Sequence, residues 1–284
     1  MQTRLQAPLR APARVAIARS VSRPVATHAA RMPDALLFDC DGVLVDTERD
    51  GHRVSFNEAF KRKCLNHVWD VDLYGHLLEI GGGKERMTKY FKDVEDKEPF
   101  KSIKDKEARK KLVQELHLLK TDIFMELVET GAMPLRPGVK RLVEEAMAAD
   151  VPVAVCSTSN ERAVSTIVRV MLGPEVAKKM RVFAGDVVPK KKPDPAIYLL
   201  AAKELKVDPA HCCVVEDSKI GLQAAKAAGM TCFVTKSSYT TNEDFTGADG
   251  IFDCIGDRGD ERFSLSDFVH ALEKKDKAKA RMKA

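Results

Sequence analysis

The feature that most constrains the fold is an alternation of short apolar runs with helical stripes in the second half of the chain. Strands are expected at 151–156, 181–184, 212–215 and 231–234, with helix-length segments between them. An earlier run, ALLF at 35–38, has the same character. Runs without polar alternation indicate strands buried on both faces, as in a parallel sheet. Strands joined through helices form right-handed βαβ units, so the sequence predicts an α/β protein with a Rossmann-like parallel sheet core.

Residues 48–131 interrupt this pattern, because they show helical periodicity and no strand-like alternation. We therefore predict an inserted helical domain at 48–131, within a core domain made of residues 32–47 and 132–284. A last helix is expected near 266–273, followed by a solvated basic tail. The longest apolar stripe in the insertion consists of Leu112, Leu116, Leu119, Ile123 and Leu127.

The first 31 residues contain six arginines and no acidic residue, which is typical of an organelle transit peptide. A basic N-terminal arm is the alternative. Without these residues, 41 basic residues face 42 acidic ones, so the body is near neutral and a nucleic-acid partner is not expected. No apolar run approaches the roughly 20 residues that span a bilayer, so no membrane partner is expected either.

Seven cysteines, an odd number with no CxxC spacing, argue against a disulfide framework or a structural zinc site. Cys156, Cys212, Cys213 and Cys232 lie in strand-like runs and are expected to be buried. Cys40 lies between two aspartates, which oppose the lowered thiol pKa that a reactive cysteine needs. Whether Cys40 is redox-regulated stays open at this point.

Polar side chains follow each of the expected strands, where carboxyl ends meet at one edge of a parallel sheet. Four acids crowded there would repel one another unless a cation compensates, and oxygen ligands suit Mg²⁺. Hydroxyls, a lysine and amides at a helix start suit a phosphate. We therefore predict phosphoryl transfer at a magnesium site. The residues concerned are Asp39, Asp41, Ser157, Thr158, Ser159, Asn160, Lys192, Glu216 and Asp217.

The order of these motifs, from Asp39-x-Asp41-Gly42 to Glu216-Asp217, resembles that of the haloacid dehalogenase-like (HAD) superfamily. The resemblance covers about residues 34 to 256. It implies the HAD fold for the core and identifies the insertion as a helical-bundle C1 cap that closes over the site. The stretches DCDGVLVDTE, GGGKER and CSTSN are similar to those of plant and algal CbbY-like phosphatases.

The resemblance also implies catalytic roles. Asp39 would be the nucleophile that forms an aspartyl-phosphate, and Asp41 would be the general acid and base. Ser157 and Lys192 would hold the transferring phosphoryl group. The superfamily's dehalogenases and phosphonatases lack an acid at position 41, so its presence favours a phosphatase or a mutase.

The implied metal ligands are Asp39, Asp217 and the backbone carbonyl of Asp41, with Glu216 assisting. The implied cofactor is Mg²⁺.

Substrate choice would depend on the cap. The CbbY-like phosphatases act on xylulose 1,5-bisphosphate, an inhibitory by-product of Rubisco, and this implies a chloroplast stromal location, with the mitochondrion as the less favoured one. Glu48 would contact a sugar hydroxyl or position the cap. The glycine-rich stretch is expected to bind the second phosphate, because glycines let backbone amides approach an anion. Its residues are Gly82, Gly83, Lys84, Glu85 and Arg86.

Two alternatives remain. A β-phosphoglucomutase-like mutase shares the core motifs, but such enzymes carry a cap histidine twelve residues after the nucleophile. That position is Gly51 here, and His52 follows it. An isolated histidine on an apolar helical stripe is also consistent with simple packing. The alternative of another class is an inactive or binding-only protein. A monomer is expected, because no long apolar surface stripe demands a partner.

Overall fold

The computed structural model describes residues 31–80, 83–259 and 262–283, so all but the last residue of the predicted transit peptide lies outside the described residues. Its centre is a six-stranded sheet in the order β3-β2-β1-β4-β5-β6, and neighbouring strands pair in parallel. The predicted α/β core is therefore confirmed. The strands are β1 (Ala35–Phe38), β2 (Val153–Ser157), β3 (Arg181–Ala184), β4 (Cys212–Glu216), β5 (Thr231–Thr235) and β6 (Gly250–Phe252).

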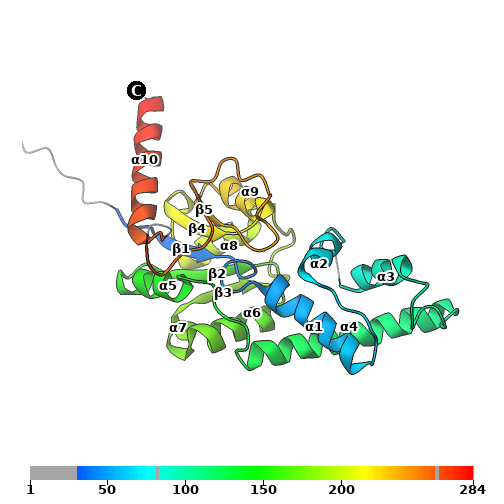
Figure 1. The fold of residues 1–284 in the computed structure, drawn as a ribbon. Coiled ribbons are helices and arrows are strands. Elements are labelled where there is room, and N and C mark those ends of the chain that lie inside the picture. Colours follow the sequence, from blue (N-terminus) through cyan, green and yellow to red (C-terminus); the bar gives the residue numbers. More distant parts are fainter. Residues whose placement is uncertain (1–30, 81–82, 260–261, 284) are drawn as a thin grey trace, which may run out of the picture.

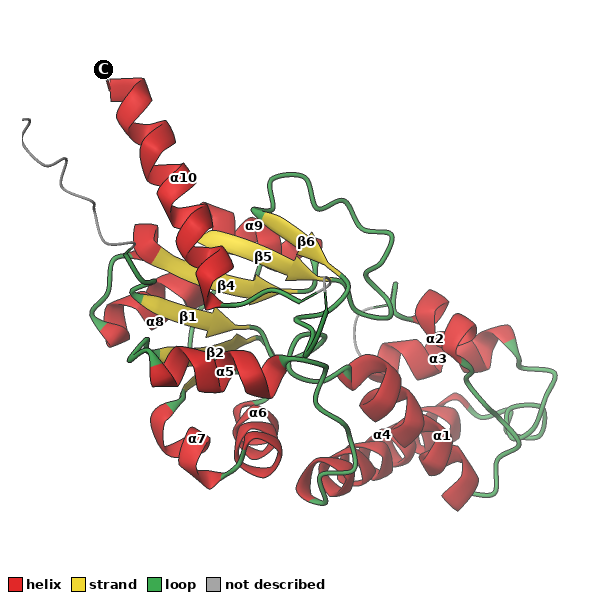
Figure 2. Ribbon diagram, turned by 60° about the vertical axis from the view of Figure 1, so that its left-hand side comes forward, coloured by secondary structure: helices red, strands yellow, loops and turns green. Residues whose placement is uncertain are grey.

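Helices cover both faces of this sheet (Figure 2). The core helices are α5 (Val139–Ala148), α6 (Glu161–Ile167), α7 (Pro174–Lys179), α8 (Ala196–Leu205), α9 (Lys219–Ala227) and α10 (Leu265–Lys283). Two short segments, η2 (Val168–Leu172) and η3 (Pro209–His211), join elements of the core.

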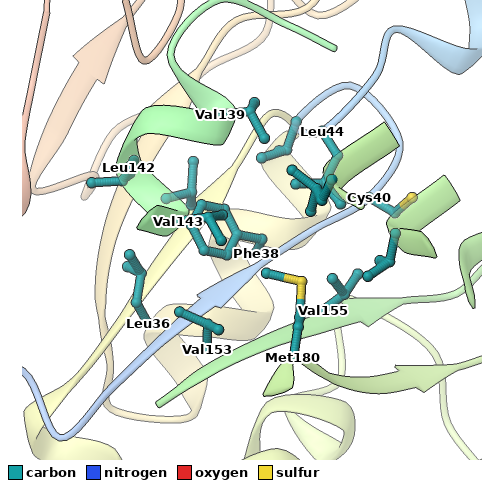
Figure 3. Packing of buried hydrophobic residues seen from close by; sticks show 14 of the residues in the cluster. Leu36, Phe38, Cys40, Leu44, Val139, Leu142, Val143, Val153, Val155 and Met180 are labelled. Carbon is teal, nitrogen blue, oxygen red and sulfur yellow. The ribbon is translucent and has the colours of Figure 1, made fainter. Parts of the chain in front are cut away.

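Side chains of β1 alternate between the two helical layers. Leu36 and Phe38 pack with residues of α5, such as Val143, as Figure 3 shows. Ala35 and Leu37 belong to the opposite cluster, with residues of α8 and α9. Burial on both faces explains why this strand is apolar throughout.

The helices of the insertion lie beside the carboxyl end of the sheet (Figure 1). They begin after a π-helical segment, η1 (Thr47–His52), and are α1 (Arg53–Arg62), α2 (Val71–Leu77), α3 (Gly83–Asp93) and α4 (Lys106–Glu129). We call α1 to α4 the cap helices. Asp70 caps α2 by accepting from the Leu73 amide at 2.8 Å, and Asp105 caps α4 by accepting from Ala108 at 2.7 Å.

The cap helices have a core of their own, built largely from aromatic rings. The rings of Phe60 and Trp69 are 5.1 Å apart, and those of Phe60 and Phe91 are 5.8 Å apart. Such edge-to-face pairs add stability beyond the burial of their area. The sequence therefore encodes a cap with a separate hydrophobic cluster, as an inserted C1 cap requires. The exact limits predicted for the two domains stay a prediction.

Three expectations about single elements were wrong. β6 was not predicted, since its three residues are too few for a periodic pattern. The tail was expected to fray, but α10 continues through the basic residues to Lys283 and extends away from the core (Figure 1).

The third error concerns α4, whose buried face is rotated by about one residue from the predicted stripe. Leu116 and Ile123 are buried as predicted, whereas Leu112, Leu119 and Leu127 are only half-buried. The other buried positions of α4 are Val113, Lys120, Phe124 and Val128. A lysine thus lies on the buried face of this helix. Within the described residues, no helix combines the length and apolarity needed to cross a membrane.

Candidate active site

The carboxyl ends of β1, β2 and β4 bring the predicted catalytic residues together. Phe38 pairs with Val155 on one side and with Val215 on the other, so the residues that follow these strands are neighbours. The amide of Asp39 donates to the carbonyl of Val215 at 3.0 Å, which extends the ladder by one bond. Asp39 is thereby fixed at the edge of the sheet, and the residue is only 7% exposed.

Lys192 reaches this edge from the loop before α8. Its ammonium group donates to Asp39 Oδ1 at 2.6 Å, to Glu216 Oε1 at 2.7 Å and to the Cys156 carbonyl at 2.9 Å. These bonds use all three of its donors. Burial favours the neutral amine, but the charges of Asp39 and Glu216 outweigh burial and raise the pKa of Lys192.

Three buried carboxylates form a cluster that could hold a metal ion. Asp39, Glu216 and Asp217 each offer one oxygen, and these oxygens lie within 4.8 Å of one another. Burial raises the pKa of Asp39 to about 7, helped by the charges of Glu216 and Asp41 and opposed by Lys192. Burial, together with the negative charges of Glu216 and Asp39, raises the pKa of Asp217 well above its usual value. One lysine does not balance this negative charge, so a divalent cation fits the cluster.

The oxygens of Glu216 are already engaged by the protein. Oε1 accepts from Lys192 and from the Tyr198 hydroxyl at 2.5 Å, and Oε2 accepts from the Asp217 amide at 3.1 Å. Glu216 is also 0% exposed. Asp39 and Asp217 are therefore better placed than Glu216 to contact an ion directly.

Gly42 allows Asp217 to approach the first motif. Its φ of 78° is in the left-handed region, and a Cβ built there would lie 2.0 Å from Asp217 Oδ2. Glycine is therefore required both by the backbone conformation and by the space that Asp217 occupies.

Hydroxyl groups surround the carboxylate of Asp41. Thr47 donates to Oδ1 at 2.6 Å, while Ser159 and Ser157 donate to Oδ2 at 2.6 Å and 3.1 Å. The Ser159 amide in turn donates to Ser157 Oγ at 3.0 Å. This network orients the carboxylate of Asp41 and holds the hydroxyl of Ser157 beside it.

Most of these groups open into one cavity of about 350 Å³, between the sheet edge, η1 and Leu78 at the end of α2. Glu48 faces it from η1, and Tyr239 faces it from the loop after β5. Asn160 instead caps α6, by accepting from the amides of Arg162 at 3.0 Å and Ala163 at 3.3 Å, and lines a second cavity beside the first. The predicted site residues that line the first cavity are Asp39, Asp41, Glu48, Thr158, Ser159, Lys192 and Asp217.

The described residues of the predicted glycine-rich stretch, 83–86, do not line the cavity. Gly82 lies outside the described residues. Gly83 begins α3, packed so closely that a Cβ there would lie 3.1 Å from the ring of His117. Lys84 and Glu85 are exposed, and neither is among the residues that line the first cavity.

Arg86 is buried, and its guanidinium is engaged within the cap. It donates to the Leu77 carbonyl at 2.9 Å and to the Tyr74 hydroxyl at 2.8 Å. The Tyr74 hydroxyl donates to Glu48 Oε2 at 2.6 Å. Arg86 therefore acts on the cavity through Tyr74 and Glu48. Burial raises the pKa of Glu48, and the hydrogen bond from Tyr74 and the charge of Arg86 oppose this effect.

Lys120 is a residue near the site that sequence reasoning missed, as it missed Thr47 and Tyr198, which bond to Asp41 and Glu216. Its Nζ donates to His52 Nδ1 at 2.9 Å, and both side chains line the second cavity, of about 420 Å³. Asp41 and Ser159 line both cavities. A signal existed in the sequence, since Lys120 falls four residues after Leu116 and three before Ile123, on the apolar face of α4.

The π-helical segment explains why His52 faces the cavities one position later than the mutase pattern predicts. A π-helix holds one more residue per turn than an α-helix, so η1 shifts the facing position by one. Gly51 is buried instead, and a Cβ there would lie 2.7 Å from Met133 Sδ. His52 also packs on Phe124, with ring centroids 4.1 Å apart.

Cys40 lies directly between the two catalytic-site aspartates but is fully buried. Burial raises the pKa of its thiol well above the usual value, and Asp41 and Asp39 add to the effect. Its environment therefore opposes a thiolate, as the sequence indicated.

Comparison with known proteins agrees with this geometry. The family model for haloacid dehalogenase-like hydrolases matches residues 33–229. The chain belongs to this family. It is 65% identical over 235 residues to a CBBY-like protein of Arabidopsis thaliana, covering 83% of this chain and 73% of that protein. It is 37% identical to protein CbbY of Cereibacter sphaeroides, over 80% of this chain and 95% of that protein.

Solved structures agree with the assignment of this chain to the HAD hydrolases. The structure of a CbbY mutant from Rhodobacter sphaeroides in complex with xylulose 1,5-bisphosphate superposes with a TM-score of 0.65 at 36% identity, over 84% of this chain and 99% of that chain. A structure of the same CbbY with phosphate superposes equally well, with a TM-score of 0.65. These comparisons confirm the predicted HAD fold and the prediction of a CbbY-like phosphatase.

Proposed function

We propose that this protein is a Mg²⁺-dependent sugar-phosphate phosphatase that converts xylulose 1,5-bisphosphate to xylulose 5-phosphate. The observation that carries the chemistry is the pair Asp39 and Asp41, which face one cavity with Lys192 on the first carboxylate and hydroxyls around the second. The complex of Rhodobacter sphaeroides CbbY with xylulose 1,5-bisphosphate supports the choice of sugar.

In the first step, a carboxylate oxygen of Asp39 attacks the phosphorus atom, and the bond from phosphorus to the sugar oxygen breaks. Asp41 gives its proton to the leaving alkoxide. In the second step, Asp41 takes a proton from water, which attacks the phosphorus and releases inorganic phosphate and free Asp39. Lys192 favours the ionised nucleophile, because its ammonium group is 2.6 Å from Asp39 Oδ1.

Asp39, Asp217 and the backbone carbonyl of Asp41 would hold the Mg²⁺ ion, and Glu216 would orient Lys192 and the Asp217 amide. When bound, the ion would neutralise charge on the phosphoryl oxygens. The donor set supports this assignment, because three buried carboxylates lie together, the pKa of Asp39 and of Asp217 is raised, and Lys192 pairs only with Asp39 and Glu216.

A phosphate-release panel tests the function. The purified protein is expected to release phosphate from xylulose 1,5-bisphosphate at least tenfold faster than from sugar monophosphates, and EDTA is expected to stop the reaction. Equal rates on both kinds of substrate would contradict the bisphosphate assignment. Asp39→Asn is expected to remove turnover without loss of folding. Phosphate release by a folded Asp39→Asn protein would show that Asp39 is not the nucleophile.

A phosphosugar mutase is the second candidate, because His52 faces the cavities despite its shift in sequence. A mutase would convert a hexose 1-phosphate to the 6-phosphate with little free phosphate, so the same panel with product analysis separates the two. A folded protein with no turnover of either substrate would favour a binding-only role.

The location and the oligomeric state are part of the proposal. Residues 1–31 are proposed to direct the protein to the chloroplast stroma, and the mature protein is proposed to be a monomer. A fusion of residues 1–35 to a fluorescent protein tests the first point, and a mitochondrial signal would contradict it. Light scattering in solution tests the second.

A further inference from the structure

Arg136 is a half-buried arginine in the segment that returns from α4 of the cap to α5 of the core. Its amide donates to the Leu44 carbonyl at 2.9 Å, so this segment lies against the one that leaves the core. Its guanidinium makes five hydrogen bonds among the described residues, and all of them go to uncharged oxygens. The acceptors are the carbonyls of Gly42, Thr235 at 3.1 Å, Lys236 at 2.6 Å and Asp253 at 2.8 Å, and the Thr235 hydroxyl at 3.3 Å.

These acceptors come from three parts of the chain that meet at Arg136. Gly42 belongs to the turn that follows β1. Thr235 ends β5, and Asp253 follows β6. The planar fork of a guanidinium has five donors in fixed directions, so it can bind several carbonyls at once and hold them relative to one another. Arg136 therefore fastens the turn after β1 to the carboxyl ends of β5 and β6.

The turn that Arg136 holds is also the one that carries groups of the candidate metal site. Gly42 follows Asp41, whose backbone carbonyl is proposed to bind the Mg²⁺ ion, and a Cβ on Gly42 would meet the carboxylate of Asp217. Because glycine restricts its own backbone least, the directions of the peptide groups on either side of it depend on their partners. The Gly42 amide donates to the Val45 carbonyl at 2.8 Å, and the Gly42 carbonyl accepts from Arg136. Both peptide groups of this glycine are thereby held.

A second link runs from Arg136 to the end of β4, where Glu216 and Asp217 follow one another. The Thr235 hydroxyl accepts from Arg136 at 3.3 Å and donates to the Glu216 carbonyl at 3.5 Å. That carbonyl belongs to the peptide group that leads into Asp217. Burial lowers the pKa of Arg136, and the negative charge of Asp217 is the largest influence that opposes this effect. Arg136 is therefore close enough to Asp217 to act on it by charge as well as through Thr235.

We propose that Arg136 is a positioning residue of the metal site. It does not line the cavity of the nucleophile, but it holds the turn at Gly42 and the end of β4 so that the Asp41 carbonyl and the Asp217 carboxylate are arranged for Mg²⁺ before the ion binds. Without Arg136, the ion itself has to order the turn, and the free energy of that ordering is subtracted from binding. This inference rests on the proposed function, since it requires a Mg²⁺ ion at this cluster.

The test compares two arginines that bind backbone carbonyls. Arg136→Met removes the guanidinium and keeps an unbranched apolar stem. Arg141→Met is the matched control, because Arg141 on α5 donates to the carbonyls of Gly256 and Phe263 at 2.7 Å, and neither belongs to the candidate site. Binding of Mg²⁺ alone is measured by thermal melting over a series of Mg²⁺ concentrations, since an ion that binds the native state raises Tm by mass action. Phosphate release from xylulose 1,5-bisphosphate is measured over the same series.

Arg136→Met is expected to raise the Kd for Mg²⁺ about tenfold or more, and to raise the Mg²⁺ concentration for half-maximal activity by a similar factor. At saturating Mg²⁺ its kcat is expected to recover most of the wild-type value, because excess ion orders the turn. Arg141→Met is expected to lose stability without a change in the Kd for Mg²⁺. If Arg136→Met does not fold, Arg136→Gln is measured against the same criteria.

The outcomes separate this inference from the proposed function. If the wild type and folded Arg136→Met bind Mg²⁺ equally well, the role of Arg136 is overturned and the function stands. An equal loss of Mg²⁺ binding in Arg141→Met also overturns it, because it indicates a general effect of stability. If the wild type binds Mg²⁺ but does not act on the bisphosphate, the proposed substrate fails and the Kd values decide the role of Arg136. If the wild type does not bind Mg²⁺, the proposed metal site and this inference both fail.

Discussion

The hydroxyl of Tyr74, on the second cap helix, donates a 2.6 Å hydrogen bond to Oε2 of Glu48, in the segment that leads from the core into the cap. Arg86 donates to the same hydroxyl at 2.8 Å. From the core side, the ring of Tyr239 packs on that of Tyr74, with centroids 5.8 Å apart. One phenol therefore connects the cavity-lining carboxylate, the cap and the loop after β5.

Tyr74→Phe is expected to lower the free energy of unfolding by about 1–3 kcal/mol, because it leaves Glu48 Oε2 without its donor and Arg86 Nη1 without its acceptor. KM for the sugar substrate is also expected to rise, since Glu48 loses its fixed orientation. Urea unfolding and steady-state kinetics measure the two effects. Tyr239→Phe is the matched control, because its hydroxyl has no hydrogen-bond partner among the described residues. Equal destabilisation by the two variants would contradict this explanation.

Gly42→Ala is expected to inactivate the enzyme through a steric clash as well as through backbone strain. Both Gly42 and Gly229 have φ near 80°, but only at Gly42 would a Cβ meet another residue, Asp217 Oδ2 at 2.0 Å. Gly229→Ala is therefore expected to cost about 1–2 kcal/mol from conformation alone and to keep its activity. Gly42→Ala is expected to cost more and to lose metal-dependent activity. Similar activities in the two variants would show that Asp217 has room to move.

The parts of the site that lie at strand ends could be predicted from sequence. Asp39 and Glu216 each follow a short apolar run, and parallel strands bring their carboxyl ends to one edge, so proximity follows from topology. A lysine from the basic loop 190–192 could be predicted at this edge, but its assignment to Lys192 came from the resemblance to a family, because the contact with Asp39 spans 153 positions.

The cap side of the site could not be predicted in the same way. A π-helical turn shifts His52 into the position that residue 51 would occupy in an α-helix, and no residue pattern in one sequence marks that turn. The basic character of Arg86 suggested a contact with the ligand. In the structure, its guanidinium donates instead to the Leu77 carbonyl and the Tyr74 hydroxyl within the cap. Lys120 was not predicted, because the predicted apolar stripe of α4 was displaced by about one residue from the face that is buried.

Mg²⁺ is expected to stabilise the protein more at pH 7.5 than at pH 5. The pKa of Asp39 is raised from 3.8 to about 7, so without metal the native state binds more protons than the unfolded state between these values. Stability from this group is therefore present at low pH and is lost as the pH rises through that window. A bound ion favours the ionised carboxylates and offsets the loss, by about 2.7 kcal/mol at a hundred times Kd.

Thermal melting with Mg²⁺ and with EDTA at the two pH values measures this effect. Asp217→Asn is expected to remove most of the gain from Mg²⁺, because it takes away one of the two carboxylates left for the ion. A gain that is the same at both pH values, or that survives in Asp217→Asn, would contradict the assignment of the ion to this cluster.

The free energy of unfolding is expected to rise with pH between about pH 8 and pH 10.5 through Lys120. Its pKa is lowered from 10.5 to about 8, first by burial, so the unfolded state binds more protons than the native state between these values. Lys120→Met is expected to lack this contribution, because it removes the titrating group. Urea unfolding of both proteins at about pH 7.5 and pH 9.5 measures it, and an equal change in the two proteins would contradict this explanation.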